Sequence, residues 1–384
     1  MVKKKQEINL EKVSVVKCKS YKQKEVDNAV SKALKLIGFD AKNLKGKSVL
    51  IKPNILGSYE KHMQIAITTN PALVAAVCKI LKKGGCKRIY IGESSFMGTD
   101  VAFKKSGIEK IARKYSVGKK PIIFEQTKLI DVKDSSAKVL KKFPVSELIG
   151  KVDFIINMPK MKTHSLARAT LGIKNLYGLI PGGLKQRLHT KAVGDKFSEI
   201  LVDIYQNIIP ELNILDGIIG MEGHGPASGT LKKAGLILAS ANAIALDIAA
   251  TSIMEFWPKE KIPAIKYALK RGLYRKDGKF ELVGMKKLPK IHFRKPVKGK
   301  TGSKVRNIFK KEKPITCNIN QCIKCGKCAK HCPVGAITLK PFPVIDKKKC
   351  IRCFCCMEVC PVHALSLGKP GDKMWFKGKF EKKK

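Results

Sequence analysis

Acidic residues are scarce in this chain of 384 residues, because 30 aspartates and glutamates stand against 78 lysines and arginines, for a formal net charge of +48. Long apolar runs are also missing, since no stretch approaches the roughly 18 residues that a membrane-spanning helix needs. The first residues run into polar sequence instead of the apolar core of a secretory signal. We therefore expect no membrane span and a reduced, cytoplasmic location.

Several motifs that mark particular functions are absent as well. No GxGxxG motif predicts a dinucleotide, and no HExxH or similar spacing predicts a separate metal centre. The lysines are spread along the whole chain, and they form no basic stripe interleaved with aromatic residues. We interpret the charge as a solvated, lysine-rich surface that attracts acidic partner proteins, and we expect no specific binding of nucleic acid.

Cysteine, by contrast, is concentrated near the C-terminus, where ten of the 13 cysteines lie between Cys317 and Cys360. Eight of them form two copies of the pattern CxxCxxCxxxCP, the second lying 28 residues after the first. Three cysteines at this spacing wrap a loop around one cubane cluster, and the fourth, before a proline, reaches the other cluster. The pattern predicts two [4Fe–4S] clusters. The expected ligands are Cys322, Cys325, Cys328 and Cys360 for the first cluster and Cys350, Cys353, Cys356 and Cys332 for the second.

Two other interpretations of these cysteines fit less well. Zinc ribbons use two CxxC pairs with a longer spacer, which differs from four cysteines within eleven residues. Disulfide frameworks belong to short secreted domains. Cys317 and Cys355 lie outside the repeated pattern, and we interpret both as spare thiols beside the clusters, with Cys355 as an alternative ligand in a rearranged cluster.

Residues 314–370 resemble the bacterial two-cluster ferredoxins. The resemblance rests on the eight cysteines, the proline after each fourth cysteine, and the pairs Ala336-Ile337 and Ala364-Leu365. It implies that single electrons pass through this segment to or from a redox partner protein. Given the charge of the chain, we expect that partner to be acidic.

The first 284 residues alternate between apolar strands and helices. Strands are expected at 13–16, 48–51, 88–92, 152–157, 212–217 and 235–240, and helices at 26–37, 71–83 and 243–256. This order predicts an α/β fold with a largely parallel sheet and helices on both faces, followed by a small α+β two-cluster ferredoxin domain. A basic segment at 285–313 predicts a linker or a strap over the first domain, and residues 371–384 a basic tail.

Three stretches of the first domain resemble a second family, the domain of unknown function DUF362, which is often fused to ferredoxin modules. They are residues 51–54, 157–178 and 216–226, which include Lys52-Pro53-Asn54 and Asn157-Met158-Pro159-Lys160. The resemblance implies a fold and a domain order, but it implies no reaction.

Polar clusters in these stretches follow apolar strands, and open α/β sheets bind ligands at the carboxyl ends of their strands. The lysines among them predict a cationic crevice for an anionic small molecule, a carboxylate or a phosphate. Each candidate also has a plain alternative as a cap, a turn residue or a solvated side chain. Candidate substrate-binding residues are Asn54, Lys160, Lys162, Lys174 and Asn175, and candidate catalytic residues are His164, His224, Glu222 and Asp216, with the histidines as proton donors.

Two functions are compatible with this pattern. An iron–sulfur oxidoreductase would pass electrons to the molecule in the crevice, whereas a ferredoxin-type carrier or scaffold would have no active site of its own. A third interpretation makes the clusters structural or regulatory. Whether the first domain binds a small molecule separates the first two.

Overall fold

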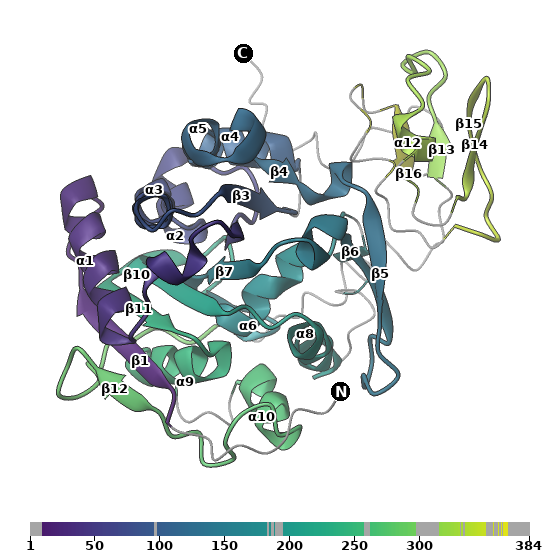
Figure 1. The fold of residues 1–384 in the computed structure, drawn as a ribbon. Coiled ribbons are helices and arrows are strands. Elements are labelled where there is room, and N and C mark those ends of the chain that lie inside the picture. The colour runs from purple at the N-terminus through teal and green to yellow at the C-terminus, as the bar shows by residue number, and fades with distance from the viewer. Residues whose placement is uncertain are drawn as a thin grey trace.

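The computed structural model describes an α/β domain and a small C-terminal domain (Figure 1). No helix in this described part of the chain is long and apolar enough to cross a membrane. The described residues are 10–95, 98–182, 184, 185, 188, 195–256, 262–296, 315–330, 332, 335–350, 356, 360, 362 and 364–367.

A ten-stranded sheet forms the centre of the α/β domain, in the order β12-β1-β11-β10-β7-β2-β3-β4, with β8 paired to β10 and β9 paired to β8. Neighbours from β10 to β4 run parallel, whereas β11 is antiparallel to both β10 and β1. The predicted α/β class with a largely parallel sheet is therefore confirmed. The strands are β1 (Lys12–Lys17), β2 (Ser48–Pro53), β3 (Arg88–Glu93), β4 (Ile122–Ile123), β7 (Phe154–Met158), β8 (Lys160–His164), β9 (Arg168–Thr170), β10 (Leu212–Glu222), β11 (Thr230–Ser240) and β12 (Glu281–Val283), and a separate hairpin pairs β5 (Leu129–Lys133) with β6 (Lys142–Ser146).

Each face of the sheet carries its own apolar core, because successive strand residues point to opposite faces. Val49 and Ile51 of β2 share one core with α1 (Gln23–Leu36), α3 (Pro71–Lys83), α4 (Thr99–Ser106) and α5 (Ile108–Tyr115). Leu50 of the same strand shares the other core with α8 (Lys196–Asn207), α9 (Ala243–Ile253) and α10 (Pro263–Lys270). In Figure 1, α3 to α5 lie above the central strands and α9 and α10 below them.

The helix predicted after Asn70 forms as α3. The Asn70 side chain accepts a hydrogen bond from the backbone N–H of Ala72, and Pro71 occupies the first turn, where its missing N–H costs nothing. The helix ends at Lys83 before Gly84, as the sequence predicts. The shorter α2 (Lys61–Ile67) precedes it in the chain and contacts β8 and β10.

Two stretches expected to follow strands lie inside strands instead. Residues 160–164 form β8, and β10 continues through Glu222, so that Asp216 lies in its middle. A polar run marks a strand end only when its side chains need water. Here Lys160 and Asp216 are both 0% exposed and satisfy each other, with Nζ and Oδ2 2.7 Å apart, so the backbone continues its ladder through them.

The described part of segment 285–313 packs on the α/β domain. The N–H of Ile291 donates to the carbonyl oxygen of Ile253 at 2.8 Å, and the carbonyl oxygen of Arg294 accepts from Gly223 at 3.0 Å. Phe293 is buried in the core that contains α9. These residues therefore match the strap alternative, while residues 297–314 and the tail at 371–384 lie outside the described residues.

The C-terminal domain is built from two halves with the same hydrogen-bond pattern. The N–H of Asn318 donates to Ala364 at 2.7 Å, and the N–H of Asp346, 28 residues later, donates to Ala336 at 2.8 Å. Each antiparallel strand pair joins a strand beside the first cysteine repeat to a strand beside the second. The elements are β13 (Ile315–Cys317) with β16 (Leu365–Leu367), β14 (Ile337–Lys340) with β15 (Phe342–Ile345), and α12 (Lys327–Lys330).

Candidate functional site

Four of the predicted cluster ligands line one cavity in the C-terminal domain, with apolar side chains such as Leu339 and Leu365 between them. Three belong to the first repeat, and the fourth comes from the second repeat, as the position before the proline requires. Cys317 of β13 lines the same cavity. The four are Cys322, Cys325, Cys328 and Cys360.

Three ligands predicted for the second cluster, Cys332, Cys350 and Cys356, lie in the apolar core of the same domain, while Cys353 and the additional Cys355 lie outside the described residues. The sulfurs of the two fourth cysteines each accept a backbone N–H at 3.2 Å, Cys332 from Ala336 and Cys360 from Ala364. Hydrogen bonds of this kind stabilise cluster thiolates. Sulfur-lined walls and paired donors fit the predicted clusters, and the assignment of single ligands stays a prediction.

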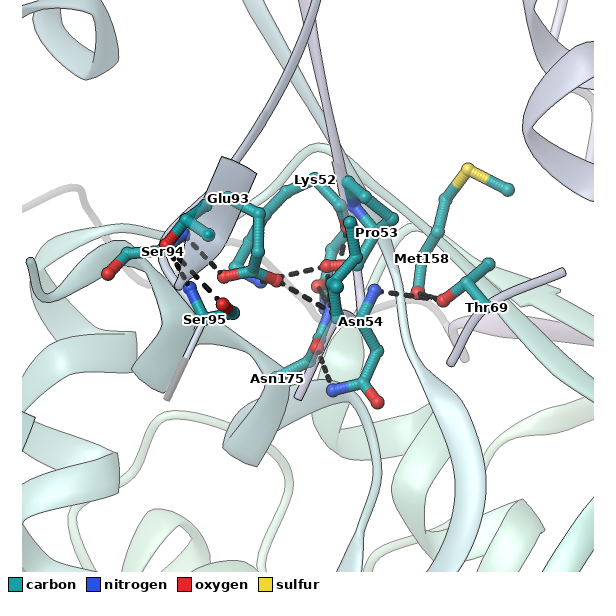
Figure 2. A network of polar contacts seen from close by, with 12 residues as sticks. Lys52, Pro53, Asn54, Thr69, Glu93, Ser94, Ser95, Met158 and Asn175 are labelled. Carbon is teal, nitrogen blue, oxygen red and sulfur yellow. Dashed lines mark hydrogen bonds and ion pairs between the residues drawn. The ribbon is translucent and has the colours of Figure 1, made fainter. Parts of the chain in front are cut away.

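A buried ion pair joins the carboxyl ends of β2 and β3 in the α/β domain (Figure 2). The Nζ of Lys52 lies 2.7 Å from Oε2 of Glu93, and the two side chains are 0% and 3% exposed. Burial lowers the pKa of Lys52 and raises that of Glu93, and their contact opposes both shifts. Gly178 lies directly against the pair, since a Cβ there would collide with the Glu93 carboxylate.

Four asparagine side chains form a hydrogen-bonded chain across the same edge of the sheet. Asn54 donates to Asn175, which donates to Asn157 of β7, each at 2.8 Å. Asn157 in turn donates to Asn213 of β10 at 2.9 Å. The Oδ1 of Asn54 is buried and has no hydrogen-bond partner among the described residues, so it offers an acceptor to a ligand.

Lys162 and Lys185 add positive charge to this region. Lys162 is 1% exposed, and its Nζ donates to the carbonyl oxygen of Ile67 at 2.7 Å. Burial, and then the charge of Lys174, lowers the pKa of Lys162 well below its ordinary value. The Nζ of Lys185 donates to the carbonyl oxygens of Ser94 and Ser95, which follow β3.

Lys174 lies in α6 (Gly172–Asn175), a short helical turn that Asp247 of α9 binds at its N-terminus. The Asp247 carboxylate accepts the backbone N–H groups of Gly172 and Ile173 at 2.6 and 3.0 Å. Burial raises the pKa of Asp247 to about 7, although these two hydrogen bonds lower it. Burial, and then the charges of Lys185 and Lys52, lowers the pKa of Lys174 to about 7.

These lysines influence one another's pKa values and so form one lysine cluster, made up of Lys52, Lys162, Lys174 and Lys185. Few carboxylates balance it among the described residues. Glu93 pairs with Lys52, while buried Glu125 accepts hydrogen bonds from hydroxyl groups through Oε1 and leaves Oε2 without a partner. Buried positive charge therefore exceeds buried negative charge at this edge of the sheet.

Lys160 and Asp216 form an ion pair of their own, separate from the lysine cluster. Besides Lys160, Asp216 binds the hydroxyl of Tyr21 at 2.8 Å and the backbone N–H of Asn70 at 2.9 Å. These contacts tie β10 to the start of α3 and to the segment before α1. A structural role accounts for both predicted site residues.

His164 is buried beside the lysine cluster. Its Nδ1 accepts the backbone N–H groups of Leu166 and Ala167 at 3.1 and 3.2 Å, so Nδ1 is unprotonated and any proton it donates comes from Nε2. The His164 ring stacks on the ring of Phe197, with the two centroids 6.2 Å apart. The Nζ of Lys174 lies 5.6 Å from the centroid of the Phe197 ring. Folding thus brings His164 and Lys174 to one aromatic side chain.

Glu222 and His224 lie at the far end of the β10–β11 hairpin. Glu222 accepts the backbone N–H and the Nε of Arg294, both at 3.0 Å, and lies 3.7 Å from the Nζ of Lys232. His224 is exposed in the turn that follows. Glu222 therefore binds the segment around Arg294 to the β10–β11 hairpin. These contacts place no acid–base partner beside Glu222.

Sequence reasoning missed Lys52, Lys185 and Glu125 as members of the site. Lys52 directly continues the apolar run Val49–Ile51, and a lysine inside a buried strand is a signal that could have identified it. Lys185 and Glu125 have no such signal, because most lysines of this chain are solvated and because both reach the site only through the fold.

Comparison with known proteins identifies both domains. A protein-family model described as a domain of unknown function, DUF362, matches residues 49–252, and one described as a 4Fe-4S dicluster domain matches residues 321–371. A thylakoid-associated protein of Synechocystis is 32% identical over 252 residues, which are 64% of this chain and 75% of that protein.

Two solved structures are weakly similar. The lactate racemase apoprotein from Thermoanaerobacterium thermosaccharolyticum is 13% identical with a TM-score of 0.41, and the match covers 64% of this chain and 57% of that one. A protein from Thermotoga maritima is 14% identical with a TM-score of 0.31, covering 54% of this chain and 52% of that one. The chain thus spans little more than half of either structure.

Proposed function

The chain belongs to the DUF362 family and continues into a 4Fe-4S dicluster domain of the electron-transfer type, and from this premise we propose that it is an iron–sulfur oxidoreductase acting on an anionic small molecule in the α/β domain. An acidic redox partner protein would exchange electrons with the dicluster domain, drawn by the net charge of +48.

The single observation that carries the proposal is the excess of buried lysine at the carboxyl ends of β2 and β3. Buried cations are costly unless an opposite charge is near. Glu93 neutralises one lysine of the cluster, while Lys162 has only the backbone carbonyl group of Ile67 as its hydrogen-bond acceptor among the described residues. A carboxylate or phosphate would supply the missing negative charge.

The chain's own residues account for binding and for proton supply. The lysine cluster clamps the anion, and the free Oδ1 of Asn54 accepts a hydrogen bond from a hydroxyl group of the ligand. Lys174, with a pKa of about 7, holds or releases a proton near neutral pH. When bound, the clusters supply single electrons.

Native mass spectrometry of the full-length protein, purified without oxygen, tests both parts. We expect a mass excess equal to two [4Fe–4S] clusters plus one small anionic molecule. Clusters alone, together with no binding of added oxalate or phosphate, would instead favour a ferredoxin-type carrier.

Calorimetric titration with oxalate and with inorganic phosphate tests the site itself. Lys162→Met should weaken the binding of at least one of these anions tenfold or more, which corresponds to about 1.4 kcal/mol. Lys83→Met makes the same change at an exposed lysine of α3 and should leave the affinity unchanged. Equal affinities in both variants would contradict an anion site at the lysine cluster.

A further inference from the structure

Lys174 differs from the other members of the lysine cluster in its contacts. Lys52 has a carboxylate partner, and Lys162 and Lys185 donate to backbone carbonyl groups. The amine of Lys174 makes no hydrogen bond to any described residue, and it lies 5.6 Å from the ring centroids of both Tyr177 and Phe197. It is also partly exposed, so a ligand can reach it.

The surroundings of Lys174 favour a neutral amine. Burial removes water from the amine, and the positive charges of Lys185, Lys52 and Lys162 act on it from other elements. Glu93 opposes this effect but is already paired with Lys52. Apolar surroundings and neighbouring cations are the two means by which proteins turn a lysine into a nucleophile.

The position of Lys174 is also held firmly. Asp247 binds the two N–H groups that open α6, and Asn175, the next residue, lies in the chain of asparagine side chains. A Cβ at Gly172 would come within 2.9 Å of the Asp247 carboxylate, so the turn and α9 are in close contact. A nucleophile needs such a fixed position relative to its substrate.

We propose that Lys174 forms an imine with a carbonyl compound that also carries a carboxylate, such as a 2-oxo acid. The amine nitrogen attacks the carbonyl carbon, a carbon–nitrogen bond forms, and the carbonyl oxygen leaves as one molecule of water, with no electrons gained or lost. The other lysines of the cluster bind the carboxylate. This inference rests on the anion site of the proposed function and deepens it by naming the substrate class.

Reductive trapping in the intact, cluster-containing protein tests the proposal. Glyoxylate and cyanoborohydride at pH 7 should convert Lys174 into a stable secondary amine, which peptide mass spectrometry locates. We expect at least tenfold more adduct at Lys174 than at exposed Lys83, because an ordinary lysine with a pKa of about 10.4 is almost fully protonated at this pH. The α-amino group, with an ordinary pKa near 8, serves as an internal standard for the trapping reaction.

Propanal, which has the carbonyl group but no carboxylate, is the matched control and should label Lys174 far less than glyoxylate does. Equal labelling by the two would overturn the substrate class, and labelling of Lys174 no greater than that of Lys83 would overturn the imine itself. Lys174→Met should remove the adduct. The comparison of Lys174 with Lys83 in the unaltered protein tests the imine even if this variant fails to fold. Oxalate binding in the same preparation shows separately whether the anion site exists.

Discussion

A buried lysine without a carboxylate raises the free energy of the folded state. We therefore expect the residues of the lysine cluster to lower the free energy of unfolding. Lys162 shows this most clearly, since it is 1% exposed and its hydrogen-bond acceptor among the described residues is a backbone carbonyl group. Replacing buried charge by an apolar side chain of similar size is often stabilising by about 1 to 4 kcal/mol. Function, not stability, then explains its presence.

Lys162→Met should therefore raise the free energy of unfolding by about 1 to 3 kcal/mol while it weakens anion binding. Urea unfolding followed by far-ultraviolet circular dichroism measures the change. Lys83→Met, at an exposed position, should alter stability by less than about 0.5 kcal/mol. A clear loss of stability in the Lys162 variant would show that the lysine is structural.

The pKa of Lys174 leads to a pH dependence with a definite sign. In the folded protein this pKa is about 7, and in the unfolded chain it is close to 10.4, so between these values the unfolded state binds more protons. The contribution of Lys174 to stability therefore rises with pH between about 7 and 10, by up to the order of 4 kcal/mol, and is lost as the pH falls through this range.

Comparing urea midpoints of the unaltered protein and of Lys174→Met at pH 7, 8 and 9 isolates this contribution. The variant should be the more stable protein at pH 7, and its advantage should shrink at each higher pH. A constant difference across the three values would mean that the Lys174 amine is protonated throughout.

At the scale of elements, the site depends on how closely the turn at α6 and η5 (Leu176–Leu179) approaches the ends of β2 and β3. Gly178 makes this approach possible, because its missing side chain leaves room for the Lys52–Glu93 pair, and its carbonyl oxygen accepts the N–H of Ser94 at 3.1 Å. Asp247 holds the other end of the same turn.

Gly178→Ala should cost about 1 to 3 kcal/mol of stability and weaken anion binding, because the new methyl group collides with buried charged groups that cannot move into solvent. Thermal unfolding and oxalate titration measure the two effects. Gly150→Ala is the control, since a Cβ there meets only a methyl carbon of Ile130 at 3.8 Å. Similar behaviour of the two variants would show that the turn tolerates displacement.

The two strand pairs of the dicluster domain differ at a position that lines a cluster cavity. Cys317 of β13 lines the first cavity together with Cys322, whereas the equivalent residue 28 positions later is Ile345 of β15. A thiol that donates to a cluster sulfur stabilises the more negative, reduced state. This difference should make the two clusters unequal.

Cys317→Ile should accordingly lower the reduction potential of one cluster and bring it closer to the other, without loss of iron. A redox titration followed by electron paramagnetic resonance measures both potentials. Ile345→Cys, the reverse change in the other half, should raise the potential of the second cluster. Loss of a cluster in the Cys317 variant would instead identify Cys317 as a ligand.

At the scale of the whole molecule, each domain contains its own apolar core, and the sheet of the first domain is covered on both faces. The two domains differ in how far apart in the sequence the residues of their sites lie. Cluster chemistry depends on cysteines that are close in the chain, whereas the anion site depends on residues from β2, β3, β7, β8 and α6 that meet only after folding.

Sequence by itself determined the features that depend on local order: the apolar strands and helices, the cap at Asn70, and the repeated cysteine pattern. It also indicated that the polar stretches near Asn54 and Lys174 belong together, which the hydrogen bond between Asn54 and Asn175 confirms. Short-range spacing is sufficient for these, because each follows from the period of a helix, the alternation of a strand or the size of a cluster.

Only the tertiary structure decided which polar residues face the site. It paired Lys160 with Asp216 in the interior, fastened Glu222 to Arg294, and brought Lys52, Lys185 and Glu125 to the edge where the sheet ends. The reason is physical: whether a charged side chain is solvated, paired or left for a ligand depends on which distant groups share its buried volume, and spacing along the chain does not contain that information.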